Sequence, residues 1–192
     1  MLLHGSKIIG TPIMGLQTGS ELAKTKRAIV DPRNLAVIAY TLEGALLGND
    51  SLALRVADIR ELSNIGMIID SSDEFVDPAD IINLQKVLDF GFELIGMAVV
   101  DETKHKLGKV VDYTLDPTSF VIQQLTVKRP ILRSFNDTEL LIHRSQVVEI
   151  TDTVIIVKMT AQKTEPLKEA VRNYQNPFRN TAPQPETTTL RD

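Results

Sequence analysis

The sequence has no cysteine and no tryptophan, and only 5% of its 192 residues are aromatic. The lack of cysteine excludes disulfides, thiol nucleophiles, thiolate-held iron–sulfur clusters and every zinc site that uses cysteine ligands. The three histidines, His4, His105 and His143, are too few and too scattered for a histidine-rich metal site. We therefore expect neither a metal ion nor another cofactor.

Strong charge of one sign and long apolar runs are also missing. The net charge is −4, so no overall basic field attracts nucleic acid or anionic lipid. The longest apolar stretches, such as Ala36–Tyr40 and Val154–Val157, have four to five residues, whereas a spanning helix needs about 20. The N-terminus lacks a basic region followed by an apolar segment. These features predict a cytoplasmic protein without direct membrane insertion.

The chain contains an internal repeat. Gly10 and Gly96 each follow an isoleucine and lie 86 positions apart, because 96 − 10 = 86. The turn Asp31–Asn34 matches the turn Asp116–Ser119 with an offset of 85, because 116 − 31 = 85. Small changes in the offset are expected from short loop insertions. The order of turn, strand, long loop and strand is the same in both copies.

Each copy is predicted to be a set of short β-strands. In the second copy, the β-branched run Val110–Leu115 and the run Phe120–Val127 flank an Asp-Pro turn, which indicates a hairpin. The first copy repeats this with Arg27–Val30 and Leu35–Leu42. The later predicted strands are Ser51–Leu54, Arg60–Leu62, Gly66–Ile69, Glu139–Ile142, Val148–Ile150 and Thr153–Lys158. A sheet this small buries its apolar faces best by closing on itself, so we expect two tandem small β-barrels.

One helix is expected between the copies. Asp77 at the N-cap, Pro78 at the first helical position and Gly91 after the end predict a helix over residues 78–89. The tail has many prolines and few aliphatic residues, with a short helix expected over Pro166–Tyr174 and disorder beyond Asn176. The predicted organisation is a first barrel at 7–76, a linking helix at 77–91, a second barrel at 92–160 and a mostly disordered tail at 161–192.

Each copy resembles the PRC-barrel family. In the second copy the matching segments are Leu94–Asp101, Gly108–Tyr113 and Val121–Val127, which fit a pattern of a "G-x-x-V-x-D" entry, a "G-K-V-x-D" strand and a returning apolar strand. The match covers residues 93–158 and, more loosely, 7–69. The small β-barrels of the photosynthetic reaction-centre H subunit and of the ribosome maturation factor's C-terminal domain belong to this family. The resemblance implies mainly-β docking and assembly modules, and it brings no catalytic residues.

In the first copy, Ala23 and Arg27 stand at the positions of the family's glycine and aspartate, which in the second copy are Gly108 and Asp112.

Two segments are the candidate contact surfaces. The loop after Val127 combines cations with apolar residues, as interface residues often do. The alternative interpretation is that Ile131 and Leu132 fold back to plug the barrel end or to meet the other copy. In the tail, apolar residues at helical spacing suit a segment that becomes ordered on a partner. The predicted partner-binding residues are Lys128, Arg129, Ile131, Leu132, Arg133, Phe135, Leu167, Val171, Tyr174 and Phe178.

Metal binding and catalysis have candidate residues, each with a structural alternative. The acidic run Asp70–Asp80 offers oxygen ligands for a hard cation, but its spacing is not that of a calcium loop, and helix capping explains part of it. His143 and Ser145 are close enough in sequence for a catalytic relay, yet no nucleophile motif surrounds them. No glycine-rich phosphate-binding motif is present.

The sequence therefore favours a non-enzymatic adaptor for protein interaction or assembly, with protein partners. An RNA- or ribosome-assembly-associated factor is the alternative, although few cations and no interleaved aromatic residues support RNA binding. A membrane-adjacent factor for division or photosystem-type assembly is a further alternative. The sequence leaves the partner and the oligomeric state open.

Replacing Ile131 and Leu132 by serine is expected to weaken capture of a protein partner and to leave the melting temperature nearly unchanged. Affinity purification and thermal unfolding measure the two effects. A large fall in the melting temperature would instead assign both side chains to the core.

Overall fold

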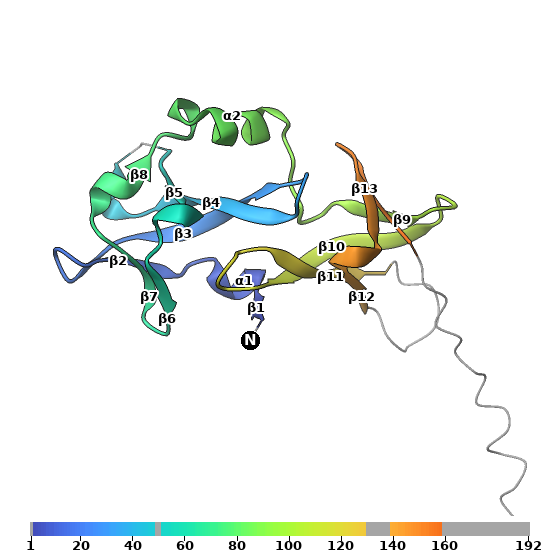
Figure 1. The fold of residues 1–192 in the computed structure, drawn as a ribbon, viewed down its shortest axis with the longest axis horizontal. Helices are drawn as coiled ribbons and strands as arrows, with labels where there is room; N and C mark the ends of the chain where they lie inside the picture. Colours follow the sequence, from blue (N-terminus) through green and yellow to red (C-terminus); the bar gives the residue numbers. More distant parts are fainter. Residues whose placement is uncertain (1, 49–50, 130–138, 159–192) are drawn as a thin grey trace, which may run out of the picture. The chain divides into compact units, whose positions relative to one another are not determined.

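The computed structural model describes residues 2–48, 51–129 and 139–158. These residues form two seven-stranded sheets, which confirms the prediction of a mainly-β protein (Figure 1). Strand pairing is antiparallel apart from one parallel pair in each sheet. Within the described residues, no helix is both long and apolar enough to cross a membrane.

The first sheet has the strand order β6-β7-β2-β3-β4-β5-β8. Its parallel pair joins β2 to β7. Its strands are β2 (Pro12–Gly15), β3 (Ser20–Asp31), β4 (Ala36–Glu43), β5 (Ala53–Arg55), β6 (Glu61–Ser63), β7 (Gly66–Ile69) and β8 (Phe75–Val76).

The second sheet has the order β12-β11-β10-β9-β14-β13, and β1 pairs with β10 beside that path. Its parallel pair joins β14 to β9. Its strands are β1 (Leu3–His4), β9 (Ala98–Asp101), β10 (Lys106–Leu115), β11 (Ile122–Lys128), β12 (Glu139–His143), β13 (Val147–Ile150) and β14 (Val154–Val157).

The two strand orders confirm the internal repeat. Strands β2 to β7 of the first sheet and β9 to β14 of the second are paired in the same sequence, with the parallel pair at the same place. In the described part of the chain, neither pairing path returns from its last strand to its first. These hydrogen bonds therefore do not close either sheet into a barrel, and the two tandem barrels stay a prediction.

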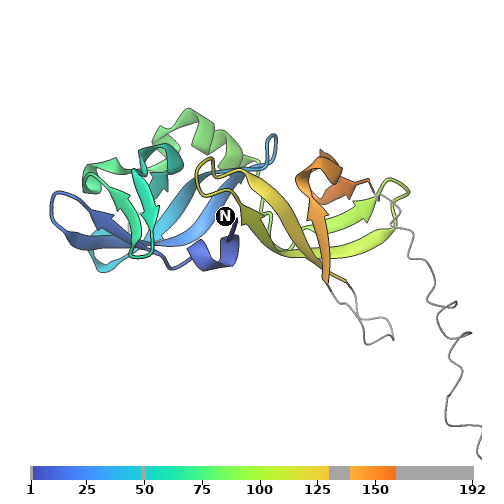
Figure 2. The same ribbon diagram turned by 60° about the horizontal axis from the view of Figure 1, so that its bottom comes forward.

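The two copies meet through equivalent residues. The Val37 N–H donates to the Phe120 carbonyl over 3.0 Å, and the Ile122 N–H donates to the Leu35 carbonyl over 2.8 Å. Ala36 and Val121 form the bridge between these bonds, and 121 − 36 = 85 is the repeat offset. Such reciprocal contacts are the mark of an approximate twofold axis. Figure 2 shows the N-terminal segment beside this junction.

A continuous apolar core runs through both sheets. At the junction, the rings of Tyr40 and Phe120 pack edge to face with centroids 6.4 Å apart. Leu35 and Phe120 are buried there although both have positive φ angles, 51° and 55°. That conformation is unfavourable for side chains of this size. Burial and the reciprocal hydrogen bonds offset its cost.

The linking helix is shorter than predicted. Asp77 and Pro78 begin a separate 3₁₀ turn, in which the Asp77 carboxylate accepts a 2.9 Å hydrogen bond from the Ala79 N–H. Ile81 then has an extended backbone, and α2 (Ile82–Asp89) starts after it. The expected stop at Gly91 is confirmed, since its φ is +64° and its N–H bonds the Leu88 carbonyl.

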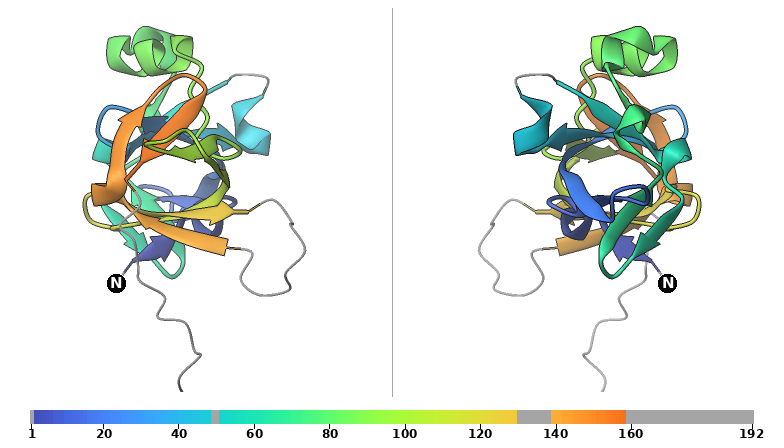
Figure 3. Two further views of the ribbon diagram at one scale, coloured as in Figure 1. Left: turned by 90° about the vertical axis from the view of Figure 1, so that its right-hand side faces the viewer. Right: turned by 90° about the vertical axis from the view of Figure 1, so that its left-hand side faces the viewer.

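Helix α2 covers the outer face of the first sheet, as Figures 1 and 3 show. Leu84 and Val87 are buried against Ile29, Ala39 and Ala53 of strands β3, β4 and β5. Ile82, at the start of the helix, is 69% exposed. A second short helix, α1 (Gly5–Ile8), follows β1.

Phe120→Ala is expected to lower the free energy of unfolding by about 3–5 kcal/mol, because it empties the core at the junction. The matched control is Phe90→Ala, since Phe90 is 49% exposed and its removal is expected to cost about 0.5 kcal/mol or less. Urea unfolding measures both. Equal losses for the two variants would contradict the packing at the junction.

Candidate functional site

The predicted partner-binding residues lie partly outside the described structure. Lys128 ends β11, and both Lys128 and Arg129 are exposed. The structure therefore leaves the loop and tail hypotheses untested. The predicted residues outside the described ranges are Ile131, Leu132, Arg133, Phe135, Leu167, Val171, Tyr174 and Phe178.

Several of the residues considered for catalysis or metal binding have local partners. The His143 Nδ1 and Ser145 Oγ are 2.8 Å apart, within a cap that also includes Gln146. Within the described residues, no carboxylate is hydrogen-bonded to the His143 ring, so the relay lacks its third member there. Asp70 of the acidic run forms an ion pair with Arg60. No group of three potential metal ligands converges among the described side chains.

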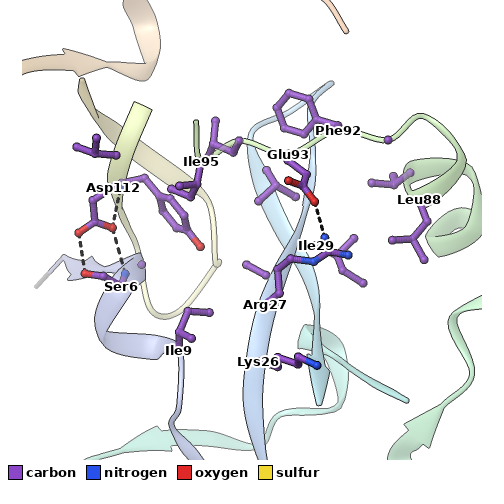
Figure 4. Close-up of a pocket in the computed structure, with 18 residues that line it drawn as sticks. Ser6, Ile9, Lys26, Arg27, Ile29, Leu88, Phe92, Glu93, Ile95 and Asp112 are labelled. Atoms are coloured by element: carbon purple, nitrogen blue, oxygen red, sulfur yellow. Dashed lines mark hydrogen bonds and ion pairs between the residues drawn. The ribbon is translucent and has the colours of Figure 1, made fainter. Parts of the chain in front are cut away.

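A groove of about 600 Å³ lies where the two sheets meet α2 and the segment that follows it. Figure 4 shows its lining, with Ile9 and Ile95 entering from the segments that precede the first strand of each copy. Consecutive residues of β3, Lys26–Val30, form one wall, and residues Val111–Tyr113 of β10 form another.

The groove is built from equivalent positions of the two copies. Gly5, Ser6 and Ile9 correspond to Gly91, Phe92 and Ile95 at the offset of 86, and all six line it. Lys26–Ala28 corresponds to Val111–Tyr113 at the offset of 85, and both segments line it. The groove therefore lies on the approximate twofold axis, and neither copy forms it alone.

Apolar side chains in this groove remain open to solvent. Ile95 is 51% exposed, Ile9 41% and Val111 39%, and they come from three separate segments of the chain. Exposed apolar residues that gather in a concave site, rather than singly, mark binding surfaces. The chemistry available here is hydrophobic contact beside a few charged groups.

Most of the charged groups in the groove have partners. Arg27 forms a 2.5 Å ion pair with Glu93 across the groove (Figure 4). Asp112 accepts hydrogen bonds from the Ser6 hydroxyl at 2.8 Å and from the Ser6 N–H at 3.1 Å. The exposed Lys26 forms no ion pair with any described residue.

Asp112 ties the N-terminal segment to the second sheet. Partial burial alone would raise the pKa of its carboxyl group, but hydrogen bonds from Ser6, the Tyr113 N–H and His4 outweigh burial and lower the pKa. Tyr113 lies under α1, because any side chain at Gly5 would overlap the Tyr113 ring. Burial, with a further contribution from Asp112, raises the pKa of the Tyr113 hydroxyl to about 12. These contacts hold one wall of the groove in place.

A comparison with models of known protein families finds no match, and a comparison with curated proteins also finds none.

Sequence reasoning missed this groove. Part of it could have been found in the sequence, because Ile9 and Ile95 occupy equivalent positions at the start of each copy. Their exposure and convergence depend on how the copies pair, which the repeat offset alone does not give.

Asp112→Asn is expected to lower the free energy of unfolding by about 1–3 kcal/mol at pH 7, because a charged acceptor with several donors is lost. The lowered pKa means that this stabilisation is present above the unfolded carboxyl pKa of about 4 and is lost as the pH falls through the folded value. The difference between wild type and variant is therefore expected to vanish in strong acid.

Urea unfolding at a series of pH values measures this difference. Glu102→Gln is the control, since Glu102 is exposed in a turn. If the difference in unfolding free energy between wild type and Asp112→Asn did not change with pH, the role of the Asp112 charge would be contradicted.

Proposed function

We propose that the chain is a non-enzymatic adaptor for protein interaction or assembly, built of two PRC-barrel-like units, and that the groove between its copies binds a protein partner. The observation that carries the proposal is the convergence of the exposed side chains of Ile9, Ile95 and Val111 in one concave site. Leaving these groups in water costs free energy that a partner recovers by covering them.

The composition of the groove supports a protein partner. Interfaces combine an apolar centre with a polar rim in which arginine is frequent. Here the partly exposed side chains of Ile9, Ile95 and Val111 line the same groove as the charged groups Arg27, Glu93 and Lys26. The groove's volume of about 600 Å³ suits a few side chains of a peptide segment.

The PRC-barrel-like part of the proposal is supported by the repeated strand order and by the motif residues of the second copy. Gly108, in the "G-K-V-x-D" strand, has a φ of +155°, and a methyl group there would overlap the carbonyl oxygen of Lys128. The glycine is therefore required by close approach of β11. Ala23 occupies the equivalent place in the first sheet, paired with Ile13 as Gly108 is paired with Val99.

Ile95→Glu is expected to abolish capture of the groove's partner, because it places a charge among apolar groups. The matched control is Ile65→Glu, since Ile65 is also an exposed isoleucine, 61% exposed, and lies outside the groove. Affinity purification with cross-linking mass spectrometry, on the full chain, compares the proteins retained by wild type and by each variant.

The proposal requires a partner that wild type and Ile65→Glu retain, that Ile95→Glu loses, and whose cross-links map to the groove. Thermal unfolding checks that both variants are folded. The same proteins retained by wild type and by Ile95→Glu would overturn the groove as the binding site.

A further inference from the structure

The two copies differ in what pairs with the equivalent edges of β10 and β3. Strand β10 pairs with β9 over its first half, Lys106–Lys109, and with β1 over its second half, where Leu3 lies opposite Leu115 and His4 opposite Thr114. The same edge of β10 is thus occupied along most of its length, by β9 first and by the N-terminal strand beyond it.

The equivalent edge of β3 is occupied only at its start. Strand β2 pairs with Ser20–Lys24, and Thr25 exchanges backbone hydrogen bonds with Gly10 and Thr11. Beyond Thr25, residues 26–31 pair only with β4, on the other side, and within the described residues no strand pairs along this free edge, although the residues Ile29 and Val30 are each only 4% exposed. The positions that β1 contacts on β10, Thr114 and Leu115, correspond here to Ile29 and Val30.

This free edge lies in the groove. Lys26 to Val30 are consecutive lining residues, and the C-terminal end of α2, where Val87 packs with Ile29, lines the groove together with the segment Gly91–Ile95. The residues at the offset of 86 from Leu3 and His4 are Asp89 and Phe90, at the end of α2. In the second sheet, β1 lies beside β10. In the first sheet, the equivalent residues belong to α2, which packs on the outer face instead of forming a strand, and the corresponding position beside β3 is part of the groove.

We infer that the β3 edge at Ala28–Val30 binds a short extended segment of a protein partner, which adds to the first sheet as β1 adds to the second. This inference rests on the proposed function and specifies how the partner binds. Main-chain hydrogen bonds supply affinity in this mode of recognition, and alternate side chains supply specificity.

The surroundings of the edge define the chemistry of the segment. Ile9, Ile95 and Val111 favour apolar side chains at alternate positions on the side that faces the groove. Arg27 is already paired with Glu93, and Asp112 is hydrogen-bonded to Ser6, so Lys26 is the lining cation that has no ionic partner within the described residues. An acidic residue beside the apolar positions complements it.

The probes are synthetic heptapeptides, chosen by selecting a displayed random library on the immobilised full chain. Each peptide is then resynthesised with a single N-methyl group at successive backbone positions. Because alternate N–H groups of a strand point to the same neighbour, methylation is expected to weaken binding at least tenfold at every second position and little between them. Amide exchange by NMR is expected to slow at alternate residues of Ala28–Val30.

Two variants locate the bound peptide. Lys26→Glu is expected to lower the affinity for acidic peptides at least fivefold. Lys24→Glu, on the part of β3 that pairs with β2, is expected to leave this affinity unchanged. Ile95→Glu is expected to abolish binding. Thermal unfolding confirms that each variant is folded.

Three results would overturn the inference. In the first, Ile95→Glu abolishes peptide binding but N-methylation at alternate positions of the peptide does not weaken it. This result would exclude the added strand and leave the adaptor proposal standing. Binding that no groove variant affects would exclude both. Protection of Ala28–Val30 in the absence of peptide, lost on dilution or on removal of residues 161–192, would assign the edge to a second copy or to this chain's own tail.

Discussion

The reciprocal hydrogen bonds between the two hairpin ends are the constraint on which the rest of the structure depends. Leu35 and Phe120 both take positive φ angles, and this lets Val37 bond Phe120 and Ile122 bond Leu35 across an approximate twofold axis. The same residues bury their side chains in the core that both sheets share. With that junction in place, strands β3 and β10 both line the groove, and both copies contribute to its walls.

The groove exists because the copies diverge next to this junction. In the second sheet, β1 and α1 cover the β10 edge and are held by Asp112, whose hydrogen bonds to Ser6 lower its carboxyl pKa. In the first sheet, Arg27 stands in place of Asp112 and pairs with Glu93 instead. The chain that would have continued as a strand becomes α2 on the outer face. A symmetric pair of units therefore has one covered edge and one free edge.

The sequence predicts the repeated part of this arrangement well and the divergent part poorly. Asp-Pro turns and alternating apolar residues define the hairpins at Asp31 and Asp116, because turn chemistry and strand alternation are local. The helix start was wrong, since Asp77 and Pro78 cap a 3₁₀ turn as readily as an α-helix. β1 and the groove were missed because two residues carry no periodicity, and their partners lie more than 100 positions away, as in Leu3 with Leu115.

A free strand edge is normally a liability, because it templates pairing with any exposed strand. Here the edge lies in a recess beneath α2 and the Gly91–Ile95 segment, with Lys26 at its side. Under the proposed mode of binding, the walls of the recess favour a single extended segment over a broad sheet, and the lysine disfavours basic segments. The proposed adaptor function requires such selectivity, because main-chain hydrogen bonds contribute similar affinity for every sequence. If a partner segment binds there as proposed, discrimination between partners would come from Ile9, Ile95 and Val111, because they line the groove and present side chains rather than main-chain hydrogen bonds.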